Sequence, residues 1–99
     1  EAARVYKLAA DQGDARAQRN LGVLYEDGRG VAKDDHEAAR LFKLAAGQGD
    51  ADAQRFLGFH YESGLGVAYN LEEAVRLYRL AAAQGDVEAI EAVKRLGRT

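Results

Sequence analysis

The sequence repeats with a period of 36 residues, and this repeat constrains the fold more than any other feature. Shifting the chain by 36 positions aligns EAARVYKLAADQGDARAQ with EAARLFKLAAGQGDADAQ, and then with EAVRLYRLAAAQGDVEAI. Between residues 1–36 and 37–72, 23 positions are identical. A fixed period of this length is typical of stacked repeats, in which each unit buries its apolar face only against its neighbours. The repeat therefore predicts an array with a long surface rather than a reaction centre.

Composition limits the classes of function that this small, 99-residue domain supports. Its net charge of −2, from 14 basic and 16 acidic residues, provides no basic surface for nucleic acid or an anionic membrane. The chain has no cysteine, which excludes disulfides and thiolate zinc sites. No apolar run approaches the roughly 20 residues that a membrane helix needs. We therefore expect no nucleic-acid partner and no membrane insertion, while the composition leaves the compartment open.

Apolar residues recur at helical spacing along the whole chain, for example at Leu41, Leu44 and Ala45, and the polar Gln48 continues the same spacing. The pattern predicts helices over residues 1–12, 15–27, 35–48, 51–63, 71–84 and 87–96. Gly-Asp pairs at 13–14, 49–50 and 85–86 predict short turns, because glycine ends a helix in the left-handed conformation and aspartate caps the next one. The predicted fold is therefore an all-α solenoid of antiparallel helix pairs, with about 36 residues per repeat.

The predicted helix starts have recognisable capping residues. Asp34 with Glu37, and Asn70 with Glu73, have the spacing of a capping box. Glu1 aligns with Glu37, at the third position of a helix, so we expect the first helix to lack its own cap. This alignment predicts that the chain is a fragment of a longer array.

Gly22 and Gly58 share one position of the repeat inside predicted helices, where a glycine costs about 1 kcal/mol relative to alanine. We interpret this as a close approach between the backbones of paired helices. Lys94 stands at the same position in the last copy and would block a following helix. The predicted organisation is a single array of residues 1–99. It comprises a partial repeat with the second helix only (1–14), two repeats (15–50 and 51–86) and a C-terminal capping helix (87–99).

These residues resemble the Sel-one-like repeat (SLR) family, which is related to tetratricopeptide repeats. The matching positions of the first copy are Ala17, Leu21, Gly22, Tyr25, Gly28, Gly30, Val31, Asp34, Ala38, Phe42, Ala45, Ala46 and Gly49, and a second copy runs from Ala53 to Gly85. The resemblance implies a right-handed superhelix that serves as an adaptor or scaffold in protein assembly. It does not extend to the family's cysteine-rich branch, because this chain has no cysteine.

By analogy with tetratricopeptide arrays, the first helix of each pair lines the concave groove. We define the groove face as the six residues predicted to contact a partner there: Arg19, Asn20, Val23, Arg55, Phe56 and Phe59. Two aromatic rings beside arginine are typical of interface hot spots. The alternative is that both rings pack against neighbouring helices and that the arginines are solvated or paired internally. Arg16, Asp52 and Glu88 also share one position with alternating sign, which suggests salt bridges between units.

Neither histidine predicts catalysis or metal binding. His36 lies in a capping segment whose consecutive side chains point in different directions, so they do not converge on an ion. His60 replaces Leu24 in the repeat, which favours a partly buried imidazole. The Gly-x-Gly turns lack the strand, the further glycine and the lysine of a phosphate loop. We expect no catalytic, cofactor-binding or metal-binding residue.

The sequence thus predicts a non-catalytic module that binds a protein or peptide in the groove. The alternative is a structural spacer, or a segment that self-associates, within a larger repeat protein.

Overall fold

The computed structural model describes residues 1–97, and these form six α-helices with no strand. The helices are α1 (Ala2–Asp11), α2 (Ala15–Asp27), α3 (Asp35–Gly47), α4 (Ala51–Ser63), α5 (Leu71–Ala83) and α6 (Val87–Arg95). Each lies within a few residues of its predicted position. The last two residues of the predicted capping segment fall outside the described part of the chain. None of the described helices is long and apolar enough to cross a membrane.

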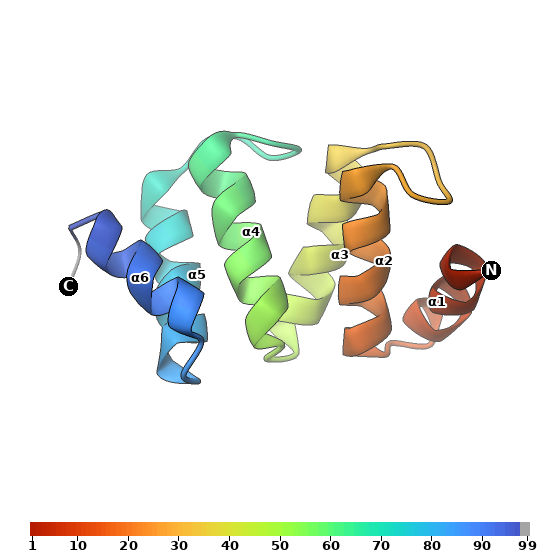
Figure 1. Cartoon of the computed structure of the whole chain (residues 1–99), viewed down its shortest axis with the longest axis horizontal. Coiled ribbons are helices and arrows are strands. Elements are labelled where there is room, and N and C mark those ends of the chain that lie inside the picture. The colour runs from red at the N-terminus through yellow and green to blue at the C-terminus, as the bar shows by residue number, and fades with distance from the viewer. Residues whose placement is uncertain (98–99) are drawn as a thin grey trace.

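The helices stack in chain order along the longest axis of an elongated molecule, whose extents are 41 × 24 × 17 Å. In Figure 1, α2, α4 and α6 form the near layer, and α3 and α5 lie behind them. Helices α1 and α6 lie at opposite ends of this stack. Helices that follow one another in the sequence pack together, from α1 against α2 to α5 against α6. This arrangement confirms the predicted α-solenoid of antiparallel pairs.

The Gly-Asp turns form as predicted. Gly13, Gly49 and Gly85 have φ angles of 91°, 93° and 90°, which lie in the region that side-chain-bearing residues rarely adopt. The carboxylates of Asp14, Asp50 and Asp86 accept hydrogen bonds from the backbone two residues inside the next helix, at Ala17, Ala53 and Ala89. These local contacts set the sharp reversal between the second helix of one repeat and the first helix of the next.

Two expectations about helix starts are corrected. Glu1 does cap α1, because its carboxylate accepts a hydrogen bond of 3.1 Å from the backbone N–H of Arg4. The capping box is only half formed: Asp34 accepts from the backbone N–H of Glu37, but the Glu37 carboxylate binds Arg40 instead. An arginine one turn along the helix therefore displaces the reciprocal bond.

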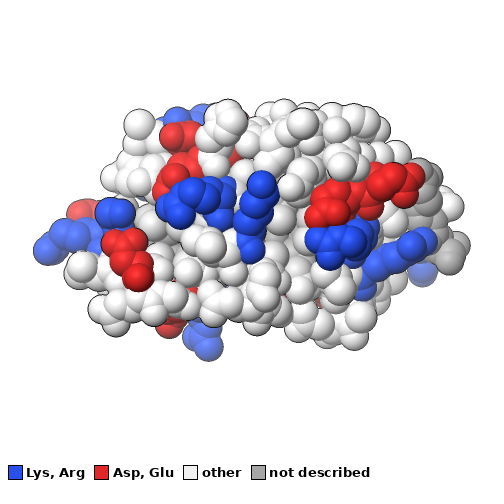
Figure 2. All heavy atoms as spheres, turned by 180° about the vertical axis from the view of Figure 1, so that it is seen from behind, with Lys and Arg blue, Asp and Glu red and all other residues white. Residues whose placement is uncertain are grey.

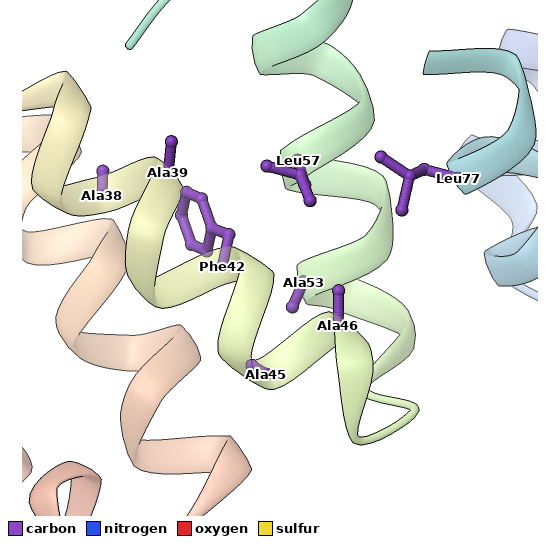
Figure 3. Packing of buried hydrophobic residues seen from close by; sticks show 8 residues of the cluster. All are labelled: Ala38, Ala39, Phe42, Ala45, Ala46, Ala53, Leu57 and Leu77. Atoms are coloured by element: carbon purple, nitrogen blue, oxygen red, sulfur yellow. The ribbon is translucent and has the colours of Figure 1, made fainter. Parts of the chain in front are cut away.

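The central core gathers around Phe42, whose side chain is completely buried. Figure 3 shows its ring on α3 beside Ala39, with Leu57 on α4 and Leu77 on α5 extending the same cluster. Small alanines on the buried side of α3 let the neighbouring helices pack closely. The core thus runs through consecutive repeats rather than being confined to one pair.

The glycine position that the two repeats share faces an aromatic ring rather than a neighbouring backbone. A Cβ atom at Gly22 would lie 2.6 Å from the Phe42 ring, and one at Gly58 would lie 3.0 Å from the Tyr78 ring. The expectation of close approach is right, but its cause differs. Each glycine makes room for the large side chain of the following helix.

The apolar residues that recur at helical spacing do not all lie on the buried face, since Leu44 is 45% exposed. Its counterparts in the other copies, Leu8 and Leu80, are also exposed. This repeat position faces outward, while Leu41 one turn earlier is buried. Helical spacing alone did not separate the two faces, because the same helix also carries exposed leucine.

Candidate functional site

Four of the six groove-face residues line one hollow of about 510 Å³: Arg19, Asn20, Val23 and Phe56. The first three come from the middle of α2, and Phe56 comes from α4. Helix α1 contributes Tyr6 to the same hollow. Arg55 and Phe59 are not among its lining residues. The predicted face is therefore divided into this hollow and a neighbouring surface on α4.

The two phenylalanines of α4 have different environments. Phe56 is partly buried and packs against the central core, with its ring centroid 5.2 Å from that of Phe42. Phe59 is 47% exposed, and its ring meets the edge of His60 at a centroid distance of 6.3 Å. Phe56 therefore packs against a neighbouring helix, as the alternative interpretation of the sequence stated, whereas Phe59 is exposed at the surface.

The arginines of the groove face are paired within the chain. Arg19 Nε lies 3.3 Å from an Asp50 carboxylate oxygen, and Arg55 Nε lies 3.2 Å from Asp86. Both aspartates also cap the following helix, so each carboxylate links the start of that helix to an arginine of the preceding repeat. The Arg55 guanidinium also lies 4.7 Å above the ring of Phe56. These contacts hold the arginines in place beside the hollow.

The predicted salt bridges between units do form, but with different arginines. Asp52 lies 3.9 Å from Arg19, and Glu88 lies 3.0 Å from Arg55. The repeat position shared with Arg16 predicts that residue as the basic partner. The acidic residues instead reach the arginine of the preceding repeat, one turn further along its helix.

His60 is completely buried, contrary to the expectation of a partly buried ring. Its Nδ1 lies 2.8 Å from the carbonyl oxygen of Leu65, and its Nε2 lies 3.0 Å from the Glu26 carboxylate. Both neighbours are acceptors, so the ring donates from both nitrogens and is an imidazolium when Glu26 is ionised. Burial opposes this charge, but the hydrogen bonds to Glu26 and Leu65 outweigh it and raise the pKa of His60.

Glu62, the counterpart of Glu26, makes a different set of contacts. It accepts a hydrogen bond of 2.8 Å from the Tyr78 hydroxyl and binds the Arg95 guanidinium at 2.5 and 3.0 Å. The Arg95 hydrogen bond lowers the pKa of Glu62, and burial raises the pKa of Tyr78. Neither glutamate was predicted as a contact residue, although Glu26 and Glu62 recur 36 residues apart in the sequence.

The opposite side of the molecule carries charges of both signs. Figure 2 shows Lys and Arg side chains beside Asp and Glu side chains on this face. On α3 and α5, one exposed ion pair repeats between copies: Arg40 lies 2.9 Å from Glu37, and Arg76 lies 2.9 Å from Glu73. Such exposed pairs contribute little to stability or to selective binding. The aromatic and polar contacts on α2 and α4 therefore make the better candidate for recognition.

These features define an all-helical repeat protein in which Phe59, on α4, is an exposed aromatic residue of the groove face. The sequence profile described as the Sel1 repeat matches residues 1–14, 15–50 and 51–86. The chain therefore belongs to the Sel1 repeat family, as the sequence predicted. Proteins of this family are generally non-catalytic scaffolds for protein interactions.

Solved structures of related proteins share this fold. A Sel1 repeat protein from Oxalobacter formigenes is 40% identical with a TM-score of 0.91, over 93% of this chain and 69% of that one. A protective antigen of uropathogenic Escherichia coli with an SLR fold is 41% identical with a TM-score of 0.87, and the match covers 88% of this chain but only 19% of that one.

The similarity extends to a cysteine-rich relative. Helicobacter pylori cysteine-rich protein B is 30% identical with a TM-score of 0.86, over 91% of this chain and 68% of that one. The present chain reaches the same fold without any cysteine. A comparison with curated protein sequences gives no significant match.

Proposed function

We propose that this chain is a non-catalytic interaction module that binds a peptide or protein partner across its groove face, with Phe59 as the anchor. The observation that carries the proposal is the 47% exposure of this ring on the layer formed by α2, α4 and α6. Burying an exposed aromatic side chain at an interface contributes more binding free energy than most other contacts.

Differences between the repeats support this role. Phe56 and Phe59 occupy the positions of Asn20 and Val23, so the framework does not require an aromatic residue at either place. Phe56, held under Arg55, gives the surface a rigid floor. Phe59, 47% exposed, has no equivalent ring in the preceding repeat, where Val23 stands. A surface that changes while its framework is kept is typical of a recognition face.

The proposal is tested by selecting binders from a phage-displayed library of random linear peptides. We expect the selected peptides to bind the Phe59→Ala variant at least about tenfold more weakly, because an anchor residue is worth about 2 kcal/mol or more. Leu80→Ala is the matched control, since Leu80 is 42% exposed but lies on α5, in the other layer. Peptides that bind both variants equally well would refute the proposed anchor.

Self-association is the competing outcome and requires a separate measurement. Light scattering over a range of protein concentrations reports the mass of wild type and of Phe59→Ala. A wild-type dimer that dissociates in Phe59→Ala would assign the ring to contact between copies and replace the proposal of a foreign partner.

A further inference from the structure

The imidazole of His60 connects the proposed anchor to the junction between the two repeats. His60 lies on α4 and is completely buried. Its nitrogens contact Glu26 of α2 at 3.0 Å and the Leu65 carbonyl oxygen, in the α4–α5 connection, at 2.8 Å. The same ring meets Phe59 at a centroid distance of 6.3 Å and Phe42 of α3 at 5.4 Å. A change at this imidazole therefore acts directly on the exposed ring of Phe59.

The histidine and the exposed phenylalanine are special to one repeat. In the preceding repeat, the position of His60 holds Leu24 and that of Phe59 holds Val23. The framework therefore requires neither an ionisable residue at the first position nor an aromatic residue at the second. The titratable ring and the exposed ring occur together and are replaced together.

The contacts of His60 require two donated hydrogen bonds. A backbone carbonyl and an ionised carboxylate can only accept, and a protonated imidazole donates from both of its nitrogens. A neutral imidazole has a single N–H, so its other nitrogen would face an acceptor oxygen with no proton between them. Because the ring is completely buried, such an unpaired contact is costly. Loss of the proton therefore moves the ring or one of its two partners.

The charged groups around this imidazole favour the protonated form. Glu26 of α2 and Asp35 at the start of α3 both raise its pKa. Lys33 offsets part of this charge, because its Nζ pairs with Asp35 at 3.3 Å and donates to the backbone carbonyl of Glu26. Helix α5 also packs on α4, but its Tyr78 hydroxyl donates to Glu62 instead. The ring is therefore controlled mainly by carboxylates on α2 and α3.

The contact between His60 and Phe59 depends on where the imidazole is held. The two ring planes meet at 86°, an edge-to-face arrangement that aromatic pairs prefer. The hydrogen bonds to Glu26 and Leu65 fix the imidazole in the orientation that makes this contact. A ring that releases one of these bonds no longer supports Phe59 in the same position.

We propose that His60 is a proton-dependent positioning residue for Phe59, so that the groove face binds its partner more tightly with a protonated imidazole than with a neutral one. The inference rests on the proposed function, because it concerns the regulation of the same anchor. The pKa of His60 is raised, so binding should weaken only as the pH rises through the folded-state pKa.

The coupling of the two rings is tested first in the free protein. The chain has three phenylalanines and two histidines, so selective ¹³C labelling of both types gives simple NMR spectra. Nuclear Overhauser contacts between the rings of His60 and Phe59 should weaken as the imidazole loses its proton between about pH 6 and pH 9. The same loss should occur in His36→Gln, which removes the other histidine. Contacts that persist unchanged through the titration of His60, or the absence of a titration, would overturn the inference.

Binding is then measured with a peptide selected at pH 6 from the random library. The peptide is acetylated and free of histidine and cysteine, so that its own charge stays constant. Its affinity should be at least about threefold higher at pH 6 than at pH 9. Because linkage is reciprocal, a saturating peptide concentration should move the NMR titration of His60 to higher pH.

Variants assign this pH dependence to the buried contact. In Glu26→Gln, the side-chain amide can donate to a neutral imidazole, which then keeps both of its contacts. The affinity of this variant should be equal at the two pH values, and so should that of His60→Leu, which introduces the residue found at position 24. Glu62→Gln is the matched control, because Glu62 shares the repeat position of Glu26 but contacts Tyr78 and Arg95. It should keep the pH dependence of the wild type.

The results also separate this inference from the proposed function. Peptides that require Phe59 but bind equally well at pH 6 and pH 9 would overturn the inference and leave the anchor in place. PH dependence that persists in both Glu26→Gln and His60→Leu would overturn it as well. Peptides that bind Phe59→Ala as tightly as the wild type would refute the anchor itself, and with it this regulation.

Discussion

The α2–α3 and α4–α5 pairs have nearly the same framework but use the same glutamate differently. In the first pair, the ring at the glycine position is Phe42, which offers no hydroxyl, and Glu26 turns to His60 of the next repeat. In the second pair, Tyr78 supplies a hydroxyl, and Glu62 accepts it while binding Arg95 of α6. The hydroxyl group that Tyr78 has and Phe42 lacks therefore accompanies a different contact of the glutamate with the next repeat.

This difference separates the contacts that both helix pairs share from those that only one pair makes. The apolar contacts within each pair are repeated, and so are the pairs that Arg19 and Arg55 form with Asp50 and Asp86. The contacts of Glu26 and Glu62, in contrast, are specific to their position. The first junction buries its cation completely, as His60. The second leaves Arg95 55% exposed, so water screens the interaction. Neighbouring repeats therefore share a fold while responding differently to mutation and pH.

The largest effects should come from the two glycines on which the shared framework depends. We expect Gly58→Leu to lower the free energy of unfolding by at least about 2–3 kcal/mol, because the side chain would displace the Tyr78 ring. Gly22→Leu should cost more, since its Cβ would lie 2.6 Å from the Phe42 ring rather than 3.0 Å. Urea unfolding followed by circular dichroism measures both.

A third helical glycine provides the control. A Cβ atom at Gly47, near the end of α3, would meet nothing within 4 Å. Gly47→Ala should therefore raise the free energy of unfolding, by up to about 1 kcal/mol, through helix propensity alone. If all three substitutions cost similar amounts, the rings do not explain the glycine position.

The next effect separates two phenylalanines on one helix. Phe56→Ala should cost about 2 kcal/mol of stability, because its ring packs against Phe42 in the core. Phe59→Ala should cost less than about 1 kcal/mol, because nearly half of its side chain is already in water. Thermal unfolding of the two variants measures the difference. Equal losses would remove Phe59 from the proposed recognition surface.

Sequence alone predicted features that depend on local chemistry. The turn at Gly49-Asp50 requires only a left-handed glycine and a neighbouring helix cap, and the residue types Gly and Asp predict both. The contact of His60 with Glu26 joins residues 34 positions apart. It also depends on Phe42, whose ring has no hydroxyl group for Glu26 to bind. Periodicity likewise placed Phe56 and Phe59 on one face but did not show that the Phe42 ring reaches only one of them.

The contact between His60 and Glu26 should weaken at high pH, and the contact between Glu62 and Arg95 should weaken at low pH. The pKa of His60 is raised above its ordinary value of 6.5, so its stabilisation is complete below that pH and is lost as the pH rises through the folded-state pKa. The pKa of Glu62 is lowered below 4.5, so its stabilisation is present above that pH and is lost in acid.

Matched substitutions isolate each contribution. Glu26→Gln should flatten the decline in stability above about pH 6.5, because the imidazolium loses its carboxylate partner. Glu62→Gln should leave that decline intact and reduce the acid sensitivity below pH 4.5. Urea midpoints measured across the pH range report both slopes. Indistinguishable profiles of the two variants would contradict the assignment of different roles to the same repeat position.

The smallest expected difference concerns the equivalent arginines Arg19 and Arg55. Both pair with the cap of the next helix, but Arg55 also lies over the ring of Phe56, whereas Arg19 has the amide oxygen of Asn20 at 3.0 Å. Lysine keeps the charge but loses the planar group that stacks on a ring. Arg55→Lys should therefore cost about 0.5–1 kcal/mol, and Arg19→Lys less than about 0.5 kcal/mol.

The comparison of these arginines is sharpened by giving the first repeat the ring that it lacks. In an Asn20→Phe background, Arg19→Lys should become as costly as Arg55→Lys in the natural sequence, because the guanidinium then has an aromatic face beside it. A double-mutant cycle for Arg55→Lys with Phe56→Leu measures the same coupling in the second repeat. A coupling near zero in both cycles would assign the position of Arg55 to its carboxylate partners alone. A positive coupling would instead make the ring at position 56 a structural support for the arginine, leaving Phe59 as the aromatic residue available to a partner.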